Sequence, residues 1–180
     1  MKFTPTTVEG AFIVDVDRIG DSRGFFGRLW CAKEMATQGL STNISQCNIG
    51  RSERAGTLRG LHLQKPPHQE VKIVRCTQGA VFDVVVDLRP DSPSFRRWFG
   101  IELNMENASM LYVPEGCATG YLTLEDNSEI YYLASEFYAP QSATGVRYDD
   151  PAFDIRWPGT PTVISDNDAS WPDFNSMEDS

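Results

Sequence analysis

Residues 80–88 read Ala-Val-Phe-Asp-Val-Val-Val-Asp-Leu, between the turn residues Thr77-Gln78-Gly79 and Arg89-Pro90. The even positions of this stretch are all apolar, whereas the odd positions include Asp83 and Asp87. Alternation with a period of two is typical of a β-strand. The stretch therefore predicts a strand whose even face packs on the core and whose odd face meets water or a polar cavity.

Short segments of the same kind lie on both sides of this strand, separated by turn residues. They are Leu58–Gln64, Lys72–Cys76, Trp98–Leu103, Ser109–Val113 and Glu129–Ala134. In the first half of the chain only Ala32–Gln38, closed by Gly39, has a convincing helical pattern. No alternation of strands and helices is visible, which excludes a Rossmann fold. The spacing of the strands predicts an all-β sandwich or barrel.

The composition limits the classes of protein to which the chain can belong. The chain has 180 residues, of which 41% are hydrophobic and 23% charged, as expected for a single globular domain over residues 1–180. No apolar run approaches the roughly 20 residues that cross a bilayer, and the first residues lack an apolar signal core. The four cysteines lie far apart and are expected to be reduced thiols. We expect a cytoplasmic protein.

The net charge of −9 argues against nucleic acid or an anionic membrane as a partner. The charge is uneven, however. Residues 18–59 hold seven basic and three acidic residues, whereas the rest of the chain holds nine basic and 22 acidic ones. A basic segment in an acidic protein suits a small anionic ligand such as a diphosphate. A solvated basic surface is the alternative interpretation.

Few groups of residues in the sequence are candidates for a catalytic or metal-binding site. His62 and Gln64 share one side of a predicted strand, which makes that side a candidate cavity wall; a hydrogen-bonded surface histidine is the alternative. With only one other histidine, His68, a metal site is not expected, although His62, His68 and Glu70 could in principle hold one ion. Motifs of nucleophilic hydrolases and of phosphate-binding loops are absent. General acid–base chemistry remains.

Several motifs follow one another in the order of a known family. They are Asp21-Ser22-Arg23-Gly24-Phe25-Phe26, Gln46-Cys47-Asn48, Gly56-Thr57-Leu58-Arg59-Gly60-Leu61-His62-Leu63-Gln64, Lys72-Ile73-Val74-Arg75, residues 79–89, Val113-Pro114-Glu115-Gly116, Tyr138-Ala139-Pro140, Asp149-Asp150-Pro151 and Ile155-Arg156-Trp157-Pro158. Over roughly residues 3–174 the chain resembles the dTDP-4-dehydrorhamnose 3,5-epimerase family. The segment Arg59–Gln64 is its most specific motif.

This resemblance implies a cupin-like jelly roll, a double-stranded β-sandwich with a few short helices, that works as a homodimer without a metal or redox cofactor. The substrate would be a nucleotide-diphosphate 4-keto-6-deoxy sugar, and the reaction an inversion of C3 and C5 through an enolate. Family members commonly exchange an N-terminal strand between subunits, a role that the apolar run Ala11–Val14 would suit.

The resemblance also implies roles for single residues. His62 matches the family's base, Asp168 the carboxylate that orients it, Lys72 the cation that stabilises the enolate, and Tyr132 the acid on the opposite face. From the sequence alone, Asp168 is instead a helix-cap residue, because Ser165 to Asp168 has the S-x-x-D pattern. The remaining matches are substrate contacts: Tyr138 stacking on the base, Phe26 as an apolar wall, and Arg23, Gln46, Asn48 and Arg59 on diphosphate and sugar.

Four substrate-binding positions depart from the family's usual residues. Thr119 stands where the family usually has histidine, Arg28 and Ala143 where glutamate is common, and Asn167 where lysine is common. These departures concern the identity of the substrate more than the chemistry. An epimerase acting on C3 only, a ketoisomerase, or a sugar-nucleotide-binding protein without turnover are the alternatives.

Overall fold

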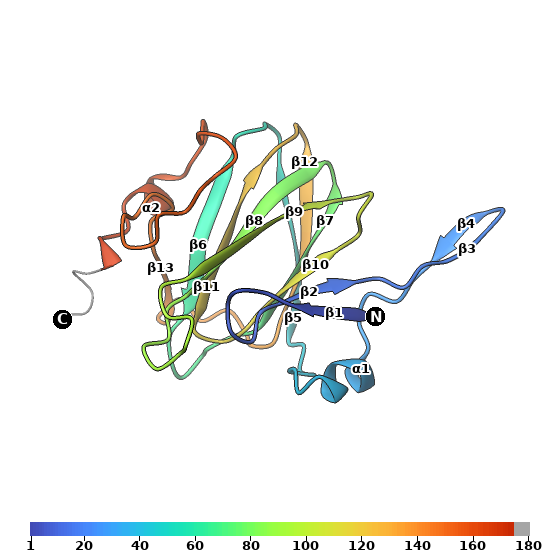
Figure 1. Ribbon diagram of the computed structural model, residues 1–180. Helices are drawn as coiled ribbons and strands as arrows, with labels where there is room; N and C mark the ends of the chain where they lie inside the picture. The colour runs from blue at the N-terminus through green and yellow to red at the C-terminus, as the bar shows by residue number, and fades with distance from the viewer. Residues whose placement is uncertain (175–180) are drawn as a thin grey trace.

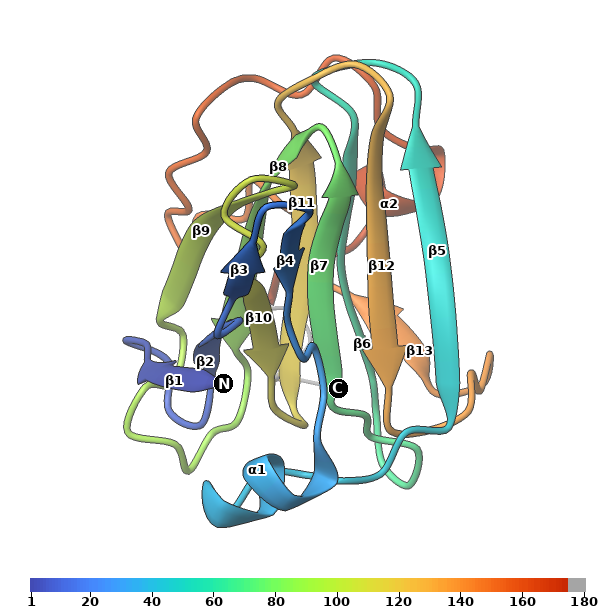
Figure 2. The same ribbon diagram turned by 90° about the vertical axis from the view of Figure 1, so that its right-hand side faces the viewer.

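Two antiparallel sheets face one another and enclose the centre of the molecule (Figures 1 and 2). The computed structural model describes residues 1–174. The first sheet has the order β1 (Lys2–Pro5), β2 (Phe12–Asp15), β10 (Met110–Val113), β7 (Lys72–Gln78), β12 (Ser128–Ala134), β5 (Gln46–Ser52). The second has the order β13 (Ala143–Gly145), β6 (Leu58–Gln64), β11 (Cys117–Thr123), β8 (Ala80–Asp87), β9 (Trp98–Asn104). The predicted all-β sandwich is confirmed.

The remaining elements are short. A two-stranded hairpin, β3 (Ile19–Asp21) and β4 (Gly24–Phe26), pairs only with itself among the described residues. Two helices, α1 (Ala32–Thr37) and α2 (Asp166–Ala169), lie outside the sheets. The predicted helix is confirmed as α1, and Gly39 follows its end with a φ of 70°, a conformation in which glycine has no steric cost. Within the described residues, no helix is long and apolar enough to cross a membrane.

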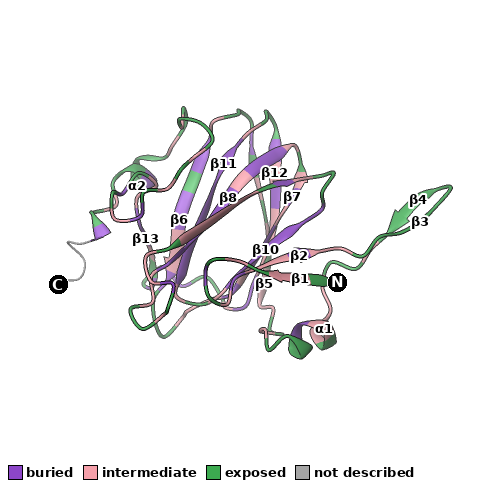
Figure 3. Cartoon of the chain, in the orientation of Figure 1, coloured by how far each residue is buried: buried purple, intermediate pink, exposed green. Residues whose placement is uncertain are grey.

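Strand β8 is buried on both faces, which corrects part of the alternation argument. Its even residues Val84 and Val86 pack on the outer side of the second sheet, under Phe153 and Phe174 of the C-terminal segment. Its odd residues point between the two sheets, where Val81 and Val85 join the central core. The strand is largely buried (Figure 3), and its odd face meets a cavity at Asp83, as predicted.

Two glycines bring β6 and β11 into close contact. Gly60 has a φ of +118°, and a Cβ added there would lie 2.6 Å from the Cα of Gly120 on β11. Only a residue without a Cβ fits this approach. In the resulting register His62 stands directly opposite Thr119, so that both side chains belong to one wall.

The single chain keeps its N-terminal segment in its own sheet, and exchange of this strand between subunits stays a prediction. The run Ala11–Val14 contributes to β2, which pairs with β1 and β10 of the same chain, because its apolar residues complete the first sheet. Instead, the β3–β4 hairpin extends away from the body of the molecule (Figure 1). Ile19, Phe25 and Phe26 on this hairpin are 72%, 55% and 68% exposed. The segment free to reach another molecule is therefore the hairpin.

Candidate active site

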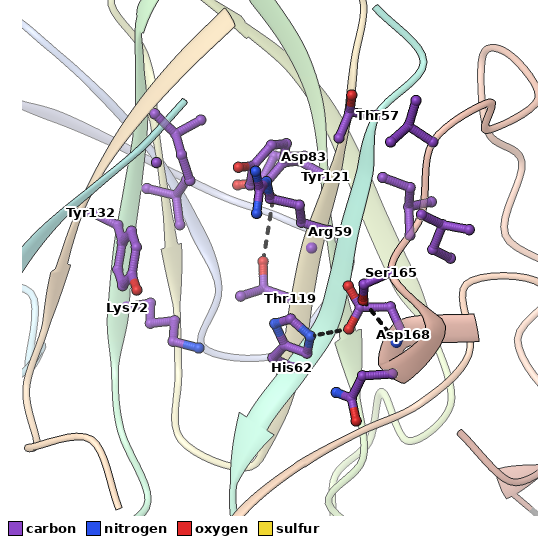
Figure 4. A pocket seen from close by; sticks show the side chains of 18 of the residues that line it. Thr57, Arg59, His62, Lys72, Asp83, Thr119, Tyr121, Tyr132, Ser165 and Asp168 are labelled. Atoms are coloured by element: carbon purple, nitrogen blue, oxygen red, sulfur yellow. Dashed lines mark hydrogen bonds and ion pairs between the residues drawn. The ribbon is translucent and has the colours of Figure 1, made fainter. Parts of the chain in front are cut away.

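Two adjoining cavities lie between the sheets. The first has a volume of about 690 Å³ and the second of about 630 Å³. His62, Lys72, Tyr132 and Asn167 line both of them, so the two cavities adjoin at these four residues. His62 comes from one sheet, and Lys72 and Tyr132 come from the other (Figure 4). A molecule bound where the cavities adjoin would have the imidazole on one side and the phenol on the other.

His62 is held by a buried carboxylate. Its Nε2 lies 2.6 Å from Oδ1 of Asp168, and Oδ2 of Asp168 accepts a hydrogen bond of 3.2 Å from the Gly60 amide. Burial alone would raise the pKa of Asp168, but the hydrogen bond and charge of His62 and the Gly60 amide lower the pKa below its usual value. An ionised Asp168 accepts a hydrogen bond from the Nε2–H of His62, which leaves the lone pair of a neutral ring on Nδ1. This arrangement suits a general base.

Helix α2 places the carboxylate. Ser165 is its N-cap, and the hydroxyl oxygen of Ser165 accepts a hydrogen bond of 3.1 Å from the Asp168 amide. The backbone of Asp168 thus serves in the cap, while its side chain bonds His62. Both interpretations of the Ser165–Asp168 pattern are correct at once, because they use different atoms of the same residue.

The facing wall carries a buried ion pair beside Tyr132. Lys72 Nζ lies 3.0 Å from Glu70 Oε1, and the two side chains are only 15% and 11% exposed. Burial, and then the negative charge of Glu70, raise the pKa of the Tyr132 phenol. Tyr132 therefore keeps its proton at neutral pH and can donate it. The neighbouring Tyr131 lines neither cavity, as the strand alternation predicts.

Thr119 and Asp83 continue the wall beyond His62. The Thr119 hydroxyl lies 2.9 Å from the Val84 carbonyl oxygen and 3.3 Å from Asp83 Oδ1. Asp83 is 1% exposed, and this burial raises the pKa of its carboxyl to about 7. Its second oxygen, Oδ2, has no hydrogen-bond partner among the described residues.

The expected nucleotide contacts are divided between the cavities. Gln46, Asn48 and Tyr138 line the second cavity, and Tyr138 is 67% exposed at its edge, where the Gln46 side chain accepts a 2.7 Å hydrogen bond from the Tyr138 amide. Arg59 lines the first cavity, where its guanidinium donates to the Ser52 hydroxyl and the Arg51 carbonyl at 3.2 Å. Of the departures from the family pattern, Thr119 lines the first cavity, Ala143 the second, and Asn167 both.

Three predicted contact residues lie outside both cavities. Arg23 and Phe26 are on the β3–β4 hairpin, where the Arg23 side chain is 87% exposed and pairs with Asp21. Arg28 pairs with Glu34 of α1 at 2.9 Å. In the single chain these three residues therefore do not line the two cavities, and their roles as substrate contacts stay predictions.

The three side chains considered as possible ligands of a metal ion are each bonded to another group. His68 bonds the Ser142 hydroxyl at 2.9 Å, Glu70 pairs with Lys72, and His62 pairs with Asp168. Each of the three groups has another partner, and no group of three metal-ligating side chains occurs among residues 1–174.

Sequence reasoning considered Glu70 only as a possible metal ligand and not as the partner of Lys72, and it missed Tyr121. Glu70 precedes Lys72 by two residues, a spacing that could have placed both on one side of an extended segment. Tyr121 lines the first cavity from β11, a strand that was not predicted. The strand was not predicted because Cys117–Thr123 contains glycine and small residues, which have low strand propensity.

The sandwich and its cavity, with the His62–Asp168 pair on one wall and Tyr132 on the other, define a class: small cupin-like proteins whose cavity carries acid–base side chains from both sheets. The family model for dTDP-4-dehydrorhamnose 3,5-epimerase matches residues 5–176. The chain belongs to this family.

Individual proteins of the family agree with the assignment. The enzyme of that name from Sinorhizobium fredii is 38% identical over 173 residues, which cover 96% of this chain and 89% of the relative. The Bacillus anthracis enzyme, solved with TDP and pyrophosphate bound, is 38% identical and superimposes with a TM-score of 0.92 over 96% of this chain and 99% of its own. The Legionella pneumophila enzyme, solved with dTDP-4-keto-L-rhamnose, is 34% identical with a TM-score of 0.90, over 97% and 93% of the two chains.

Proposed function

We propose that this protein inverts C3 and C5 of a dTDP-linked 4-keto-6-deoxy sugar by removing and returning protons on opposite faces of the ring. One observation carries the proposal: a carboxylate-held imidazole on one sheet faces a protonated phenol on the other, with an ammonium group between them (Figure 4). Family membership and the sugar nucleotides bound by related proteins support the choice of substrate.

In each inversion, His62 acts first. Its Nδ1 lone pair takes the proton from the carbon next to the ketone, the C–H electrons form a C=C bond, and the carbonyl electrons move onto the C4 oxygen. The ionised Asp168 stabilises the imidazolium that results. The Lys72 ammonium stabilises the negative charge of the enolate oxygen, a form of stabilisation that exists only after proton removal and therefore lowers the barrier.

Tyr132 completes the inversion. The enolate collapses to the ketone as the carbon takes the phenol proton from the opposite face, and the tyrosine then regains a proton from solvent while His62 releases its own. The charge of Glu70 helps to keep the phenol protonated until that moment. The same pair of groups serves C3 and C5 in turn, because both carbons flank C4.

The second cavity suits the nucleotide. Gln46 and Asn48 offer amide groups, and Tyr138 offers an exposed ring on which a base can stack. Asn167 and Ala143 leave this end of the site without the lysine and glutamate that the family usually has there. In the single chain Arg28 lies outside both cavities and its guanidinium pairs with Glu34.

We further propose that the full chain forms one domain and works as a homodimer in which the β3–β4 hairpin enters the partner's site. An isolated two-stranded hairpin is marginally stable in water, and this one exposes Ile19, Phe25 and Phe26. Docking would bury these side chains. It would also bring Arg23 and Phe26 to a site that otherwise lacks them.

The test is turnover of dTDP-4-keto-6-deoxyglucose, followed by proton NMR through the ring couplings that report the configuration at C3 and C5. The wild type should invert both centres. His62→Ala should be slower by about 10²- to 10⁴-fold, the usual contribution of a general base. His68→Ala is the matched control, because this second histidine lines neither cavity. Inversion at C3 alone would identify a C3 epimerase, and binding without turnover would contradict the proposal.

A further inference from the structure

Lys72, the cation expected at the enolate oxygen, is held by a carboxylate of the cavity wall. Its Nζ lies 3.0 Å from Glu70 Oε1, and the two side chains are 15% and 11% exposed. In the described part of the chain, Glu70 makes no other ion pair and no side-chain hydrogen bond. Glu70 lines the second cavity only, whereas Lys72 lines both. The ammonium is therefore held from the side of the second cavity.

A second carboxyl group competes for the same ammonium. Asp83 lines the first cavity only, and the charge of Lys72 reaches it there. The structure nevertheless pairs Lys72 with Glu70. Without Glu70, the flexible lysine side chain would be free to turn towards Asp83 or towards a bound anion. Glu70 thus determines where the positive charge lies.

That place is beside the expected acid. In the register of β7 and β12, Ala134 stands opposite Lys72, and Tyr132 stands two residues before Ala134. Residues two apart on a strand share a face, so Lys72 and Tyr132 are diagonal neighbours on the inner face of the first sheet (Figure 4). An ammonium kept there lies where the two cavities adjoin, which is where the ketone of the sugar has to lie.

The substrate itself would compete for the lysine. The second cavity suits the nucleotide, so the diphosphate of a bound substrate would carry its negative charge into a space that Lys72 also lines. A lysine paired with the diphosphate would stabilise the substrate and the transition state equally, which does not raise the rate of the chemical step. The Glu70 carboxylate opposes this capture in two ways, because it holds the ammonium and repels the anion.

We propose that Glu70 is a positioning residue that keeps the Lys72 ammonium at the enolate oxygen and prevents it from pairing with the diphosphate of the substrate. The inference rests on the proposed function, since it assumes that a sugar nucleotide occupies the two cavities. It implies that Glu70 weakens binding of the nucleotide in order to favour the reaction.

The test measures kcat with dTDP-4-keto-6-deoxyglucose and the affinity for dTDP by calorimetry. Glu70→Gln removes the charge at nearly constant volume. It should bind dTDP about threefold more tightly or better, because a like charge is lost and the ammonium is free. Its kcat should fall by at least about tenfold, because the ammonium is misplaced. Glu102→Gln, exposed on β9, removes the same charge outside both cavities and should match the wild type.

Two further variants separate positioning from charge. Glu70→Asp keeps the charge but is one methylene shorter, so kcat should fall while dTDP affinity stays within about twofold of the wild type. This variant carries the test if the glutamine variant does not fold. In a Lys72→Met background, Glu70→Gln should change kcat by less than about twofold, because the group that Glu70 positions is gone.

Tighter dTDP binding together with a lower kcat supports the role of Glu70, because damage to the fold would weaken both. An unchanged kcat, a dTDP affinity that is unchanged or weaker in Glu70→Gln, or a full loss of kcat in the Lys72→Met background overturns that role and leaves the epimerase proposal standing. A wild type that binds dTDP without turning over the substrate contradicts the proposed function itself, and the role of Glu70 with it.

Discussion

Two carboxyl groups of one cavity differ in their tendency to ionise, because their surroundings differ. Both Asp168 and Asp83 are buried, and burial alone raises the pKa of each. Asp168 has the His62 ring and the Gly60 amide as partners, which bring its pKa below the usual value. For Asp83, burial outweighs the hydrogen bonds of Thr119 and of the Val84 backbone, and it raises the pKa to about 7. Such separation is typical of sites where acid and base roles are divided.

The raised pKa of Asp83 predicts a pH-dependent stability. The pKa in the folded state, about 7, lies above the usual value of 3.8, so folding favours the protonated form. The stability from this group is complete below about pH 4 and falls as pH rises towards 7, by up to about 1.4 kcal/mol per pH unit. The amide side chain of Asp83→Asn does not titrate in this pH range. Its free energy of unfolding, relative to the wild type, should therefore rise from pH 5 to pH 7.

Urea unfolding of both proteins at several pH values measures this difference. The other titratable groups are common to the two proteins, so their contributions cancel in the comparison. A difference between variant and wild type that stays constant from pH 5 to pH 7 would show that Asp83 is not held in its neutral form.

At the scale of elements, the β3–β4 hairpin decides whether the site is complete in one chain. Its exposed aromatic residues and Arg23 lie outside both cavities. If the hairpin enters the partner's site, a subunit without His62 still has an intact hairpin. That hairpin can complete the site of a partner whose own hairpin is altered. Activity should then be restored by mixing two variants that are each defective alone.

The experiment mixes His62→Ala with the double variant Arg23→Ala and Phe26→Ala, after joint unfolding and refolding. In the mixed dimer one of the two sites combines an intact His62 with an intact hairpin. With random pairing about half of the dimers are mixed, and one of the two sites in each mixed dimer is intact. The mixture should therefore have about a quarter of wild-type activity. His62→Ala mixed with Tyr132→Phe is the control, since both residues belong to the same chain's cavity and no intact site forms. Equal activity of the two mixtures, or a monomer by light scattering, would contradict the shared site.

Sequence reasoning succeeded for individual elements and failed where the fold brings distant segments together. The alternation in 80–88 and the turns around it predict β8 to within one residue, because strand and turn patterns are local. The pair His62–Asp168 spans 106 residues, and only the family resemblance indicated it. The direction of the hairpin has no local signal either, because its exposed Phe26 is the kind of residue that a pattern places in a core.

At the scale of the whole molecule, the sandwich holds acid and base on separate sheets. The central core between the sheets includes Val81, Val85, Leu103 and Leu111, all fully buried, and each such side chain contributes roughly 1.5–3 kcal/mol. This packing keeps the distance between β6 and β12 fixed, and so sets the gap that the sugar must fill. Inversion therefore needs two proton transfers, a removal and a return, on opposite faces of one bound ring.

Solvent exchange tests this claim most directly. With dTDP-4-keto-6-deoxyglucose in deuterium oxide, the wild type should place one deuteron at C3 and one at C5, both in the inverted configuration, as proton NMR would show. Tyr132→Phe should still exchange protons, through His62, without inverting the centres, and His62→Ala should do neither. Inversion without deuterium at either carbon, or exchange in His62→Ala at the wild-type rate, would contradict the account.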